Sequence, residues 1–152
     1  MKKIVFLITL WISIIDVYSQ NSIKDLEYID ASASFTSYYA KIGSIKKVGN
    51  KTYKVWIYSY PQYGHEDECR NSMVNEHNNE KYSNFTHSVS LYNVDCNNVK
   101  IGTSKIIDYA TNGEILFSSE YYTTIYSDVV PDTIGESIYE YVCKYVMENK
   151  VK

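Results

Sequence analysis

The C-terminal stretch of the chain combines a helix start, an apolar stripe and a cysteine. Pro131 favours a turn, and Thr133 with Glu136 three residues later forms a capping box. In this motif the threonine oxygen accepts a hydrogen bond from the Glu136 amide, and the glutamate accepts one from the Thr133 amide. Apolar residues then recur at helical spacing, at Ile134, Ile138, Val142, Tyr145 and Val146. The pattern predicts one helix that packs on a sheet, with Cys143 on the flank of its apolar stripe.

Alternating segments upstream predict that sheet. The clearest strand is expected at 52–60, with Tyr53, Val55 and Ile57 on one face and Trp56, Tyr58 and Tyr60 on the other. Further strands are expected at 26–33, 35–41, 85–96, 105–110 and 115–124. The last two flank an Asn-Gly pair, which is a strong hairpin signal. We therefore expect an α+β fold: an antiparallel sheet of five or six strands with one helix packed on a face.

Two connecting segments lack apolar periodicity. Residues 44–51 predict a turn with exposed lysines, and residues 65–81 predict a long polar loop that could include one helical turn. Side chains of the types that bind zinc gather in and after this loop, at His65, Glu66, Asp67, Glu68, Cys69, His77, Glu80 and His87. Their spacing fits no established zinc pattern, so we expect a solvated loop and no metal site.

The N-terminus predicts export. Lys2 and Lys3 precede an apolar run over residues 4–15, and Ser19 stands before the polar Gln20. This order is typical of a secretory signal peptide, which we expect to be cleaved after Ser19. The run is shorter than the ~20 residues that span a bilayer. We therefore expect a signal peptide at 1–19 and a single domain at 20–152. That domain would have no stable membrane insertion, would be periplasmic, secreted or associated with the cell surface, and would mature where disulfides form.

Charge and motif content exclude several functions. Without the signal peptide, the 15 basic and 18 acidic residues become 13 and 17, a net charge of −4. This balance, with no basic block, argues against nucleic acid and against anionic lipid as partners. The chain has no Gly-x-Ser-x-Gly nucleophile elbow and no phosphate-binding glycine loop. No residue at a characteristic sequence spacing from Cys69 is identifiable as a general base that would activate its thiol. We expect no enzyme activity and no cofactor.

Short motifs follow one another in a characteristic order along most of the mature chain. They are Tyr38-Tyr39-Ala40 followed by Gly43-Ser44-Ile45, then Val55-Trp56-Ile57, then Tyr92-Asn93-Val94-Asp95-Cys96, and finally Val130-Pro131-Asp132-Thr133-Ile134-Gly135-Glu136 with Cys143. In content, order and spacing these motifs resemble the bacterial surface-adhesin protein E family.

The resemblance implies a curved antiparallel sheet with a C-terminal helix tethered to it by a disulfide. It maps that bridge onto Cys96 and Cys143, and closing a loop of about 48 residues would stabilise the fold by about 4 kcal/mol. Taken alone, the sequence also allows both to be free thiols. Cys69, the odd cysteine, could pair between chains, stay free or compete for either of the others.

The resemblance also implies a function. The best-known family member is a lipid-anchored adhesin that binds host matrix and can dimerise, whereas this sequence has no lipidation cysteine after its apolar run. We therefore expect an exported, non-enzymatic binding module for a protein or peptide partner, with a homodimer as an open option. The candidate partner-binding residues are Lys46, Lys47, Lys51, Tyr58 and Tyr60. The alternative is a periplasmic structural or accessory subunit of an envelope assembly.

Overall fold

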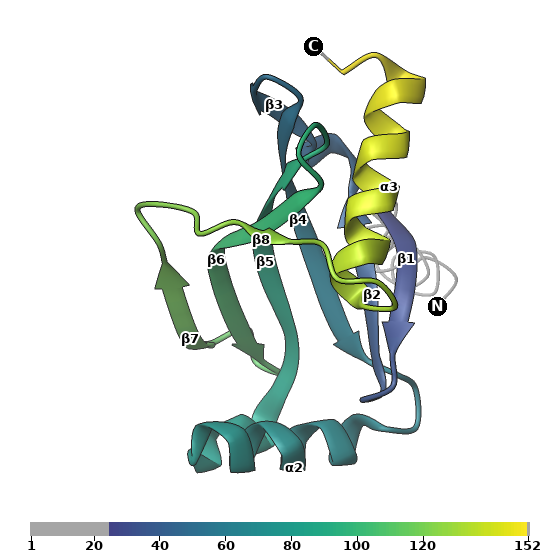
Figure 1. Ribbon diagram of the computed structural model, residues 1–152. Helices are drawn as coiled ribbons and strands as arrows, with labels where there is room; N and C mark the ends of the chain where they lie inside the picture. Colours follow the sequence, from purple (N-terminus) through teal and green to yellow (C-terminus); the bar gives the residue numbers. More distant parts are fainter. Residues whose placement is uncertain (1–24, 152) are drawn as a thin grey trace, which may run out of the picture.

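The computed structural model describes residues 25–151, so the predicted signal peptide lies outside the described residues. The described chain forms one antiparallel sheet of eight strands with two α-helices (Figure 1). The strands are β1 (Leu26–Ser32), β2 (Thr36–Lys41), β3 (Lys46–Gly49), β4 (Thr52–Pro61), β5 (Phe85–Asp95), β6 (Lys100–Ala110), β7 (Ile115–Glu120) and β8 (Ser127–Asp128). The helices are α2 (Glu66–His77) and α3 (Ile134–Asn149), with 3-10 turns η1 (Ile42–Ser44) and η2 (Glu80–Asn84). Neither α-helix is long and apolar enough to cross a membrane.

The predicted fold class is confirmed. Six strands follow one another across the sheet in the order β1-β2-β4-β5-β6-β7. The two additional strands are short: β3 pairs with β4, and β8 pairs with β6. β3 lies in the segment predicted to be a turn, and all four of its residues are exposed. Such strands bury too little apolar surface to leave an alternating pattern in the sequence.

One face of the sheet carries the core under α3, and we call it the covered face. The alternation predicted for β4 is confirmed, because Tyr53, Val55 and Ile57 are buried on this face. From the helix, Ile138 and Val142 are fully buried in the same cluster. Burying each such side chain contributes about 1.5–3 kcal/mol. The apolar stripe of α3 is thus the main contact that holds the helix on the sheet.

The start of α3 differs slightly from the expected capping box. The Thr133 hydroxyl accepts a hydrogen bond from the Glu136 amide at 3.3 Å, as predicted. The Glu136 carboxylate, however, accepts one from the Asp132 amide at 2.8 Å rather than from the Thr133 amide. Asp132 has a positive φ of 59° and lies in the segment that leads into the helix. The Thr133 hydroxyl and the Glu136 carboxylate therefore both accept hydrogen bonds from backbone amides at the start of the helix.

Covalent and polar contacts tie α3 to the interior strand β5 and to the edge strand β1. Cys143 forms a disulfide with Cys96, which directly follows β5, and their Cα atoms are 5.7 Å apart. On the β1 side, the Ser137 hydroxyl donates to the Asp30 carboxylate at 2.6 Å. The Tyr141 hydroxyl donates to Glu27 at 2.7 Å. The tethered C-terminal helix implied by the family resemblance is present.

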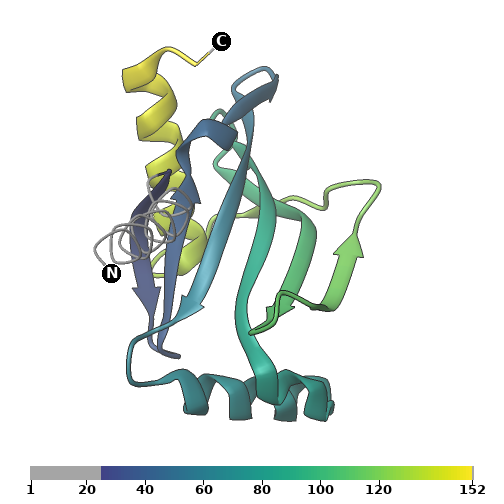
Figure 2. The same cartoon turned by 180° about the vertical axis from the view of Figure 1, so that it is seen from behind.

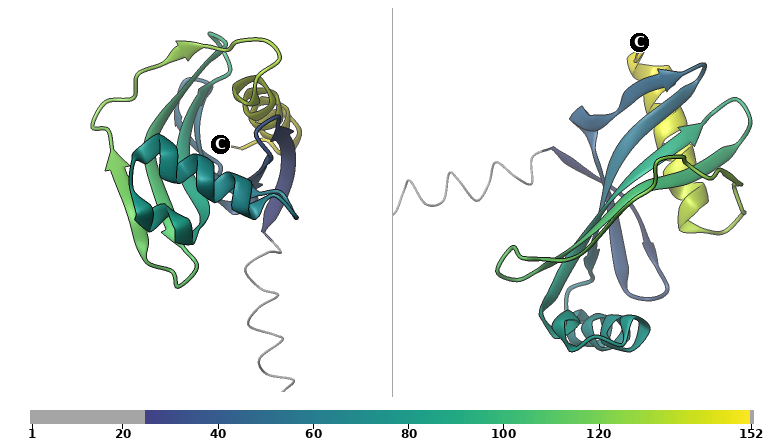
Figure 3. Two further views of the ribbon diagram at one scale, coloured as in Figure 1. Left: turned by 90° about the horizontal axis from the view of Figure 1, so that it is seen from below. Right: turned by 90° about the vertical axis from the view of Figure 1, so that its left-hand side faces the viewer.

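The loop predicted over residues 65–81 is wrong, because this segment contains α2 and the start of η2. The helix has no fully buried residue, so it lacks the apolar stripe on which the prediction depended. Its other signals are present in the sequence. Three acidic residues occupy the first turn, which favours a helix N-terminus, and Asn78 ends the helix in a left-handed conformation at φ 47°. α2 crosses one end of the sheet (Figure 3).

Gly102 of β6 is the point where the β7–β8 connection lies closest to the sheet. A Cβ atom at this position would lie 2.5 Å from the Ile125 carbonyl oxygen, so only glycine leaves room for the crossing backbone. Beside it, the Asn93 side chain is 2% exposed and donates to the Thr124 hydroxyl at 3.0 Å. These contacts fix the path of the chain from β7 towards α3.

Candidate functional site

The face of the sheet opposite α3 carries Trp56, Tyr58 and Tyr60, and we call it the open face. No α-helix of residues 25–151 lies over it (Figure 2). Six aromatic side chains cross this face, and we call them the aromatic row: Tyr28 (β1), Tyr39 (β2), Tyr58 and Tyr60 (β4), His87 (β5) and Tyr109 (β6).

Strand register explains why these rings meet. Tyr28 pairs with Tyr39, Tyr39 pairs with Tyr58, and His87 pairs with Tyr109. Residues directly opposite each other in an antiparallel pair project from the same face, with Cβ atoms ~5 Å apart. Because side chains alternate along each strand, these rings project from the open face while the residues between them project towards the core.

The rings in the middle of the row stack on one another. The ring centroids of Tyr60 and His87 are 5.0 Å apart with 18° between the planes, and those of His87 and Tyr109 are 4.9 Å apart with 11°. Tyr39 meets Tyr60 edge to face at 6.0 Å. Since the stacked rings turn their faces towards each other, they present edges and hydroxyl tips to a partner. Aromatic edges carry the positive part of the ring quadrupole.

Partial burial shifts two groups of the row. It raises the pKa of Tyr60, with smaller contributions from Tyr58 and Tyr39. It lowers the pKa of His87, against a small opposing effect of the Asp108 carboxylate. Because the ordinary histidine pKa is already below 7, the imidazole is neutral at neutral pH. At that pH the row presents neutral rings and phenolic donors.

The predicted partner-binding residues are not brought into one cluster. Tyr58 and Tyr60 lie in the aromatic row. Lys46 pairs with Lys54 of β4, so it projects from the open face, but about 20 Å along the strand from Tyr60 at 3.3 Å per residue. Lys47 pairs with the core-facing Tyr53 and therefore projects from the covered face. Lys51 lies in the turn between β3 and β4, at a positive φ of 53°.

A basic groove adjoins the aromatic row on the open face. Three lysines, Lys41, Lys46 and Lys54, line a groove of ≈ 340 Å³ together with Trp56 and Leu91. Within residues 25–151, none of these lysines lies within ion-pair distance of a carboxylate. The groove therefore gathers three lysines at one end of the open face, and Lys54 helps to lower the pKa of the Glu120 carboxyl.

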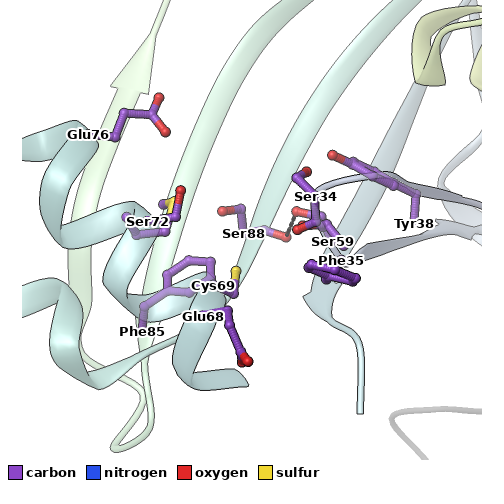
Figure 4. Close-up of a pocket in the computed structure, with 12 residues that line it drawn as sticks. Ser34, Phe35, Tyr38, Ser59, Glu68, Cys69, Ser72, Glu76, Phe85 and Ser88 are labelled. Carbon is purple, nitrogen blue, oxygen red and sulfur yellow. Dashed lines mark hydrogen bonds between the residues drawn. The ribbon is translucent and has the colours of Figure 1, made fainter. Parts of the chain in front are cut away.

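A cavity of ≈ 500 Å³ lies between α2 and the covered face (Figure 4). From the helix it is lined by Glu68, Cys69, Ser72, Met73 and Glu76, of which the last four recur at i, i+3, i+4 and i+7 and so share one side of α2. Burial is the main factor that raises the pKa of the Cys69 thiol. This thiol is outside the disulfide and stays protonated at neutral pH, which makes it a poor nucleophile.

The residues considered as metal ligands do not gather in space. His65 stacks on Phe35 at 3.9 Å, His77 stacks on Tyr82 at 4.2 Å, and His87 belongs to the aromatic row. In the part of the chain that the structure describes, no group of three or more His, Cys, Asp or Glu side chains could hold a metal ion.

Comparison with known proteins identifies the family. A family model described as surface-adhesin protein E matches residues 27–144. The chain belongs to the surface-adhesin protein E family. The resemblance inferred from the short motifs is thereby confirmed, and the family makes this chain an adhesin-like surface protein. No curated protein matches the sequence.

A solved structure shares the fold of this chain. One structure of Haemophilus influenzae protein E matches with a TM-score of 0.50 and 11% identity, over 80% of this chain and 86% of that chain. Crystal form II of the same protein matches with a TM-score of 0.48 and 14% identity, over 78% of this chain and 87% of that chain. At such low identity the likeness concerns the fold alone.

Sequence reasoning found only part of the open face. It placed Tyr58 and Tyr60 on the side of β4 away from the core, but it missed Tyr28, Tyr39, His87 and Tyr109. Alternation within each strand was the available signal, because each of these residues neighbours a residue that faces the other side. The pairing of the strands brings the rings together, and the sequence of a single strand does not predict that pairing.

Proposed function

We propose that this protein is a non-enzymatic binding module that holds an extended, acidic segment of a protein partner on its open face. The proposal is an adhesin-type function, in keeping with the family. The observation that carries it is the aromatic row, which runs across β1, β2, β4, β5 and β6 without an α-helix of the described chain over it.

The composition of the row favours a protein partner. Tyrosine offers a large rigid contact surface with few rotatable bonds, so ordering it on binding costs little entropy. All the rings except Tyr28 are half-buried, which limits their movement further. A row built from such side chains is preorganised, and preorganisation increases affinity by reducing the entropy lost on binding.

The charge of the open face favours acidic side chains in that partner. Lys41, Lys46 and Lys54 carry no ion pair within the described residues. The stacked rings turn positive edges and hydroxyl donors outwards. Carboxylates on the partner would meet both features. Complementary charge of this kind mainly raises the association rate and selects the partner.

The other expectations for this chain stay predictions. They include the homodimer, the periplasmic or secreted location and the role of an envelope accessory subunit. Lys47 and Lys51 also remain candidates for contacts outside the open face. No catalytic role enters the proposal: the thiol of Cys69 is held in its protonated form, and the histidines are dispersed.

The test uses an immobilised copolymer of glutamate and tyrosine as a surrogate for an acidic partner, read by biolayer interferometry. Replacing Tyr39 and Tyr60 together by serine should weaken binding by about tenfold or more, as expected when central aromatic contacts are lost. The matched control is Tyr63→Ser, since Tyr63 is 99% exposed and outside the row. Thermal unfolding of each variant would show that the fold is retained.

A second set of variants tests the charge. Replacing Lys41, Lys46 and Lys54 by glutamine should slow association and reduce its dependence on salt. The control is Lys144→Gln, an exposed lysine on α3 at the other face of the sheet. The proposal is wrong if the wild-type protein does not bind the copolymer, or if the row variants bind as well as Tyr63→Ser.

A further inference from the structure

We propose that the cavity between α2 and the covered face is a second binding site, and that it takes a neutral sugar unit of one or two rings. This site is separate from the open face and does not depend on the function proposed for it. Its volume of ≈ 500 Å³ lies within the range of roughly 300–1,000 Å³ that is usual for small-molecule sites.

The floor of the cavity is polar where a core would be apolar. On the covered face, Tyr38 of β2 pairs with Ser59 of β4, Ser59 pairs with Ser88 of β5, and Ser88 pairs with Asp108 of β6. Further along β2 and β4 the same face carries the apolar residues that pack under α3, such as Ala40 and Ile57. The switch from apolar residues to hydroxyls therefore coincides with the end of the helix-covered core.

Hydrogen bonds hold this floor in place. The Ser88 hydroxyl donates to one oxygen of Asp108, and the Tyr82 hydroxyl donates to the other at 2.8 Å. The Ser59 hydroxyl donates to the Ser88 carbonyl at 3.5 Å. Each serine oxygen that donates in this way keeps acceptor capacity for a ligand. The floor is thus a fixed array of hydroxyl oxygens.

The lining decides the class of ligand. No lysine, arginine or histidine lines the cavity, so a phosphate or carboxylate ligand would find no opposite charge. Hydroxyls line it from three directions: Ser34 and Thr36, Ser59 and Ser88, and Ser72 of α2. Glu68 and Glu76 add carboxylates that accept hydrogen bonds from ligand hydroxyls. A neutral ligand with many hydroxyl groups matches this set.

Aromatic side chains complete the wall. Phe35 and Phe85 both line the cavity, and they supply the apolar surface that such sites combine with a few polar groups. Phe35 has a positive φ of 58°, which is unusual for a bulky residue. Backbone hydrogen bonds from its amide to Ser32 and from Gln62 to its carbonyl hold it there, and its ring stacks on His65. Residues held in such conformations cluster at ligand sites.

The test measures sugar binding by saturation-transfer NMR and isothermal calorimetry. The probes are the methyl glycosides of glucose, galactose, mannose and N-acetylglucosamine, together with lactose and chitobiose. At least one should bind the wild-type protein. Ser72→Phe, which projects a ring from α2 into the cavity, should weaken that binding by about tenfold or more. Asn75→Phe is the matched control, because Asn75 is exposed on the same helix and does not line the cavity.

Cys69 provides a second reading from inside the cavity. Saturating sugar should slow the reaction of its thiol with N-ethylmaleimide in the wild-type protein. The proposal is overturned if none of the sugars binds, if Ser72→Phe and Asn75→Phe bind equally, or if sugar leaves the labelling rate unchanged. It is also overturned if spermidine, a cationic amine, displaces the bound sugar and binds more tightly at low salt, which would assign the cavity to cations.

Discussion

The two helices lie on the same side of one sheet, yet they relate to it in opposite ways. α3 buries Ile138, Val142, Cys143 and Val146 against the covered face and is joined to the end of β5 by a disulfide. α2 buries no residue fully, and its inner side faces a cavity lined with hydroxyls. One helix completes the core, whereas the other forms a wall of a candidate site.

The difference separates stability from binding. Most of the free energy that holds a helix in a protein comes from packing of an apolar face rather than from helix propensity. α3 has that packing, so the domain depends on it. α2 has little, so it can open locally without unfolding the sheet, as ligand-binding elements commonly do.

The largest expected effect comes from the disulfide. Replacing Cys96 and Cys143 together by serine should lower the free energy of unfolding by about 4 kcal/mol, because the loop between cysteines 47 positions apart in the sequence is no longer closed in the unfolded chain. Urea unfolding under non-reducing conditions measures the change. Cys69→Ser, on α2, is the control and should change stability by less than about 0.5 kcal/mol. Equal losses in the two variants would erase the distinction between the helices.

A smaller effect is expected from truncating one apolar side chain on each helix. Ile138→Ala should cost about 3 kcal/mol, because Ile138 is 0% exposed and truncation leaves a cavity in the core. Met73→Ala should cost no more than about 1 kcal/mol, since Met73 is only half-buried beside an existing cavity. Thermal unfolding of both variants at one pH gives the comparison. A larger loss for Met73→Ala would mean that α2, too, is part of the core.

The smallest effect concerns pH. The Ser137 hydroxyl and the Ala31 amide lower the pKa of the Asp30 carboxyl in the folded protein. A lowered folded-state pKa stabilises the fold above the unfolded-state pKa of about 3.9, and this stability is lost as pH falls through the folded value. Asp30→Asn should therefore be slightly less stable than wild type at pH 6, and the gap should close by about pH 2.

The hydrogen bond between Asp30 and Ser137 can be isolated by a double-mutant cycle. If Asp30→Asn and Ser137→Ala act through the same contact, the double variant at pH 6 should be no less stable than the less stable of the two single variants. Additive losses would show that the carboxylate acts elsewhere. Since this contact joins β1 to the first turn of α3, the cycle measures how much the polar tie adds to the apolar packing.

The same contrast explains what the sequence could reveal. Thr133, Glu136 and the apolar stripe after them are local signals, so α3 was predicted, as was the alternation in β4. The alternating run that ends at Cys96 indicated the partner of Cys143, and the family resemblance supported that choice among the pairings that three cysteines allow. α2 was missed because its inward residues, Cys69 and Ser72 among them, face a cavity and leave no apolar period.

The candidate sites were harder to predict than the fold for a physical reason. The aromatic row and the hydroxyl floor each consist of single residues from different strands. Tyr39 and His87 are brought near Tyr60 only by the register of neighbouring strands, and register is set by the whole sheet. Sequence patterns within one segment describe which side a residue faces but not which ring lies next to it.

The Cys96–Cys143 bond also determines how the domain responds to mechanical pulling. A tension applied between β1 and the C-terminal end of the chain reaches Cys143 and passes directly to Cys96 through the sulfur atoms. The 97–142 segment, which includes β6, β7, β8 and the first turns of α3, is bypassed and cannot be extended while the bond is intact. The force is instead borne by β1, β2, β4 and β5, the strands that carry most of the aromatic row.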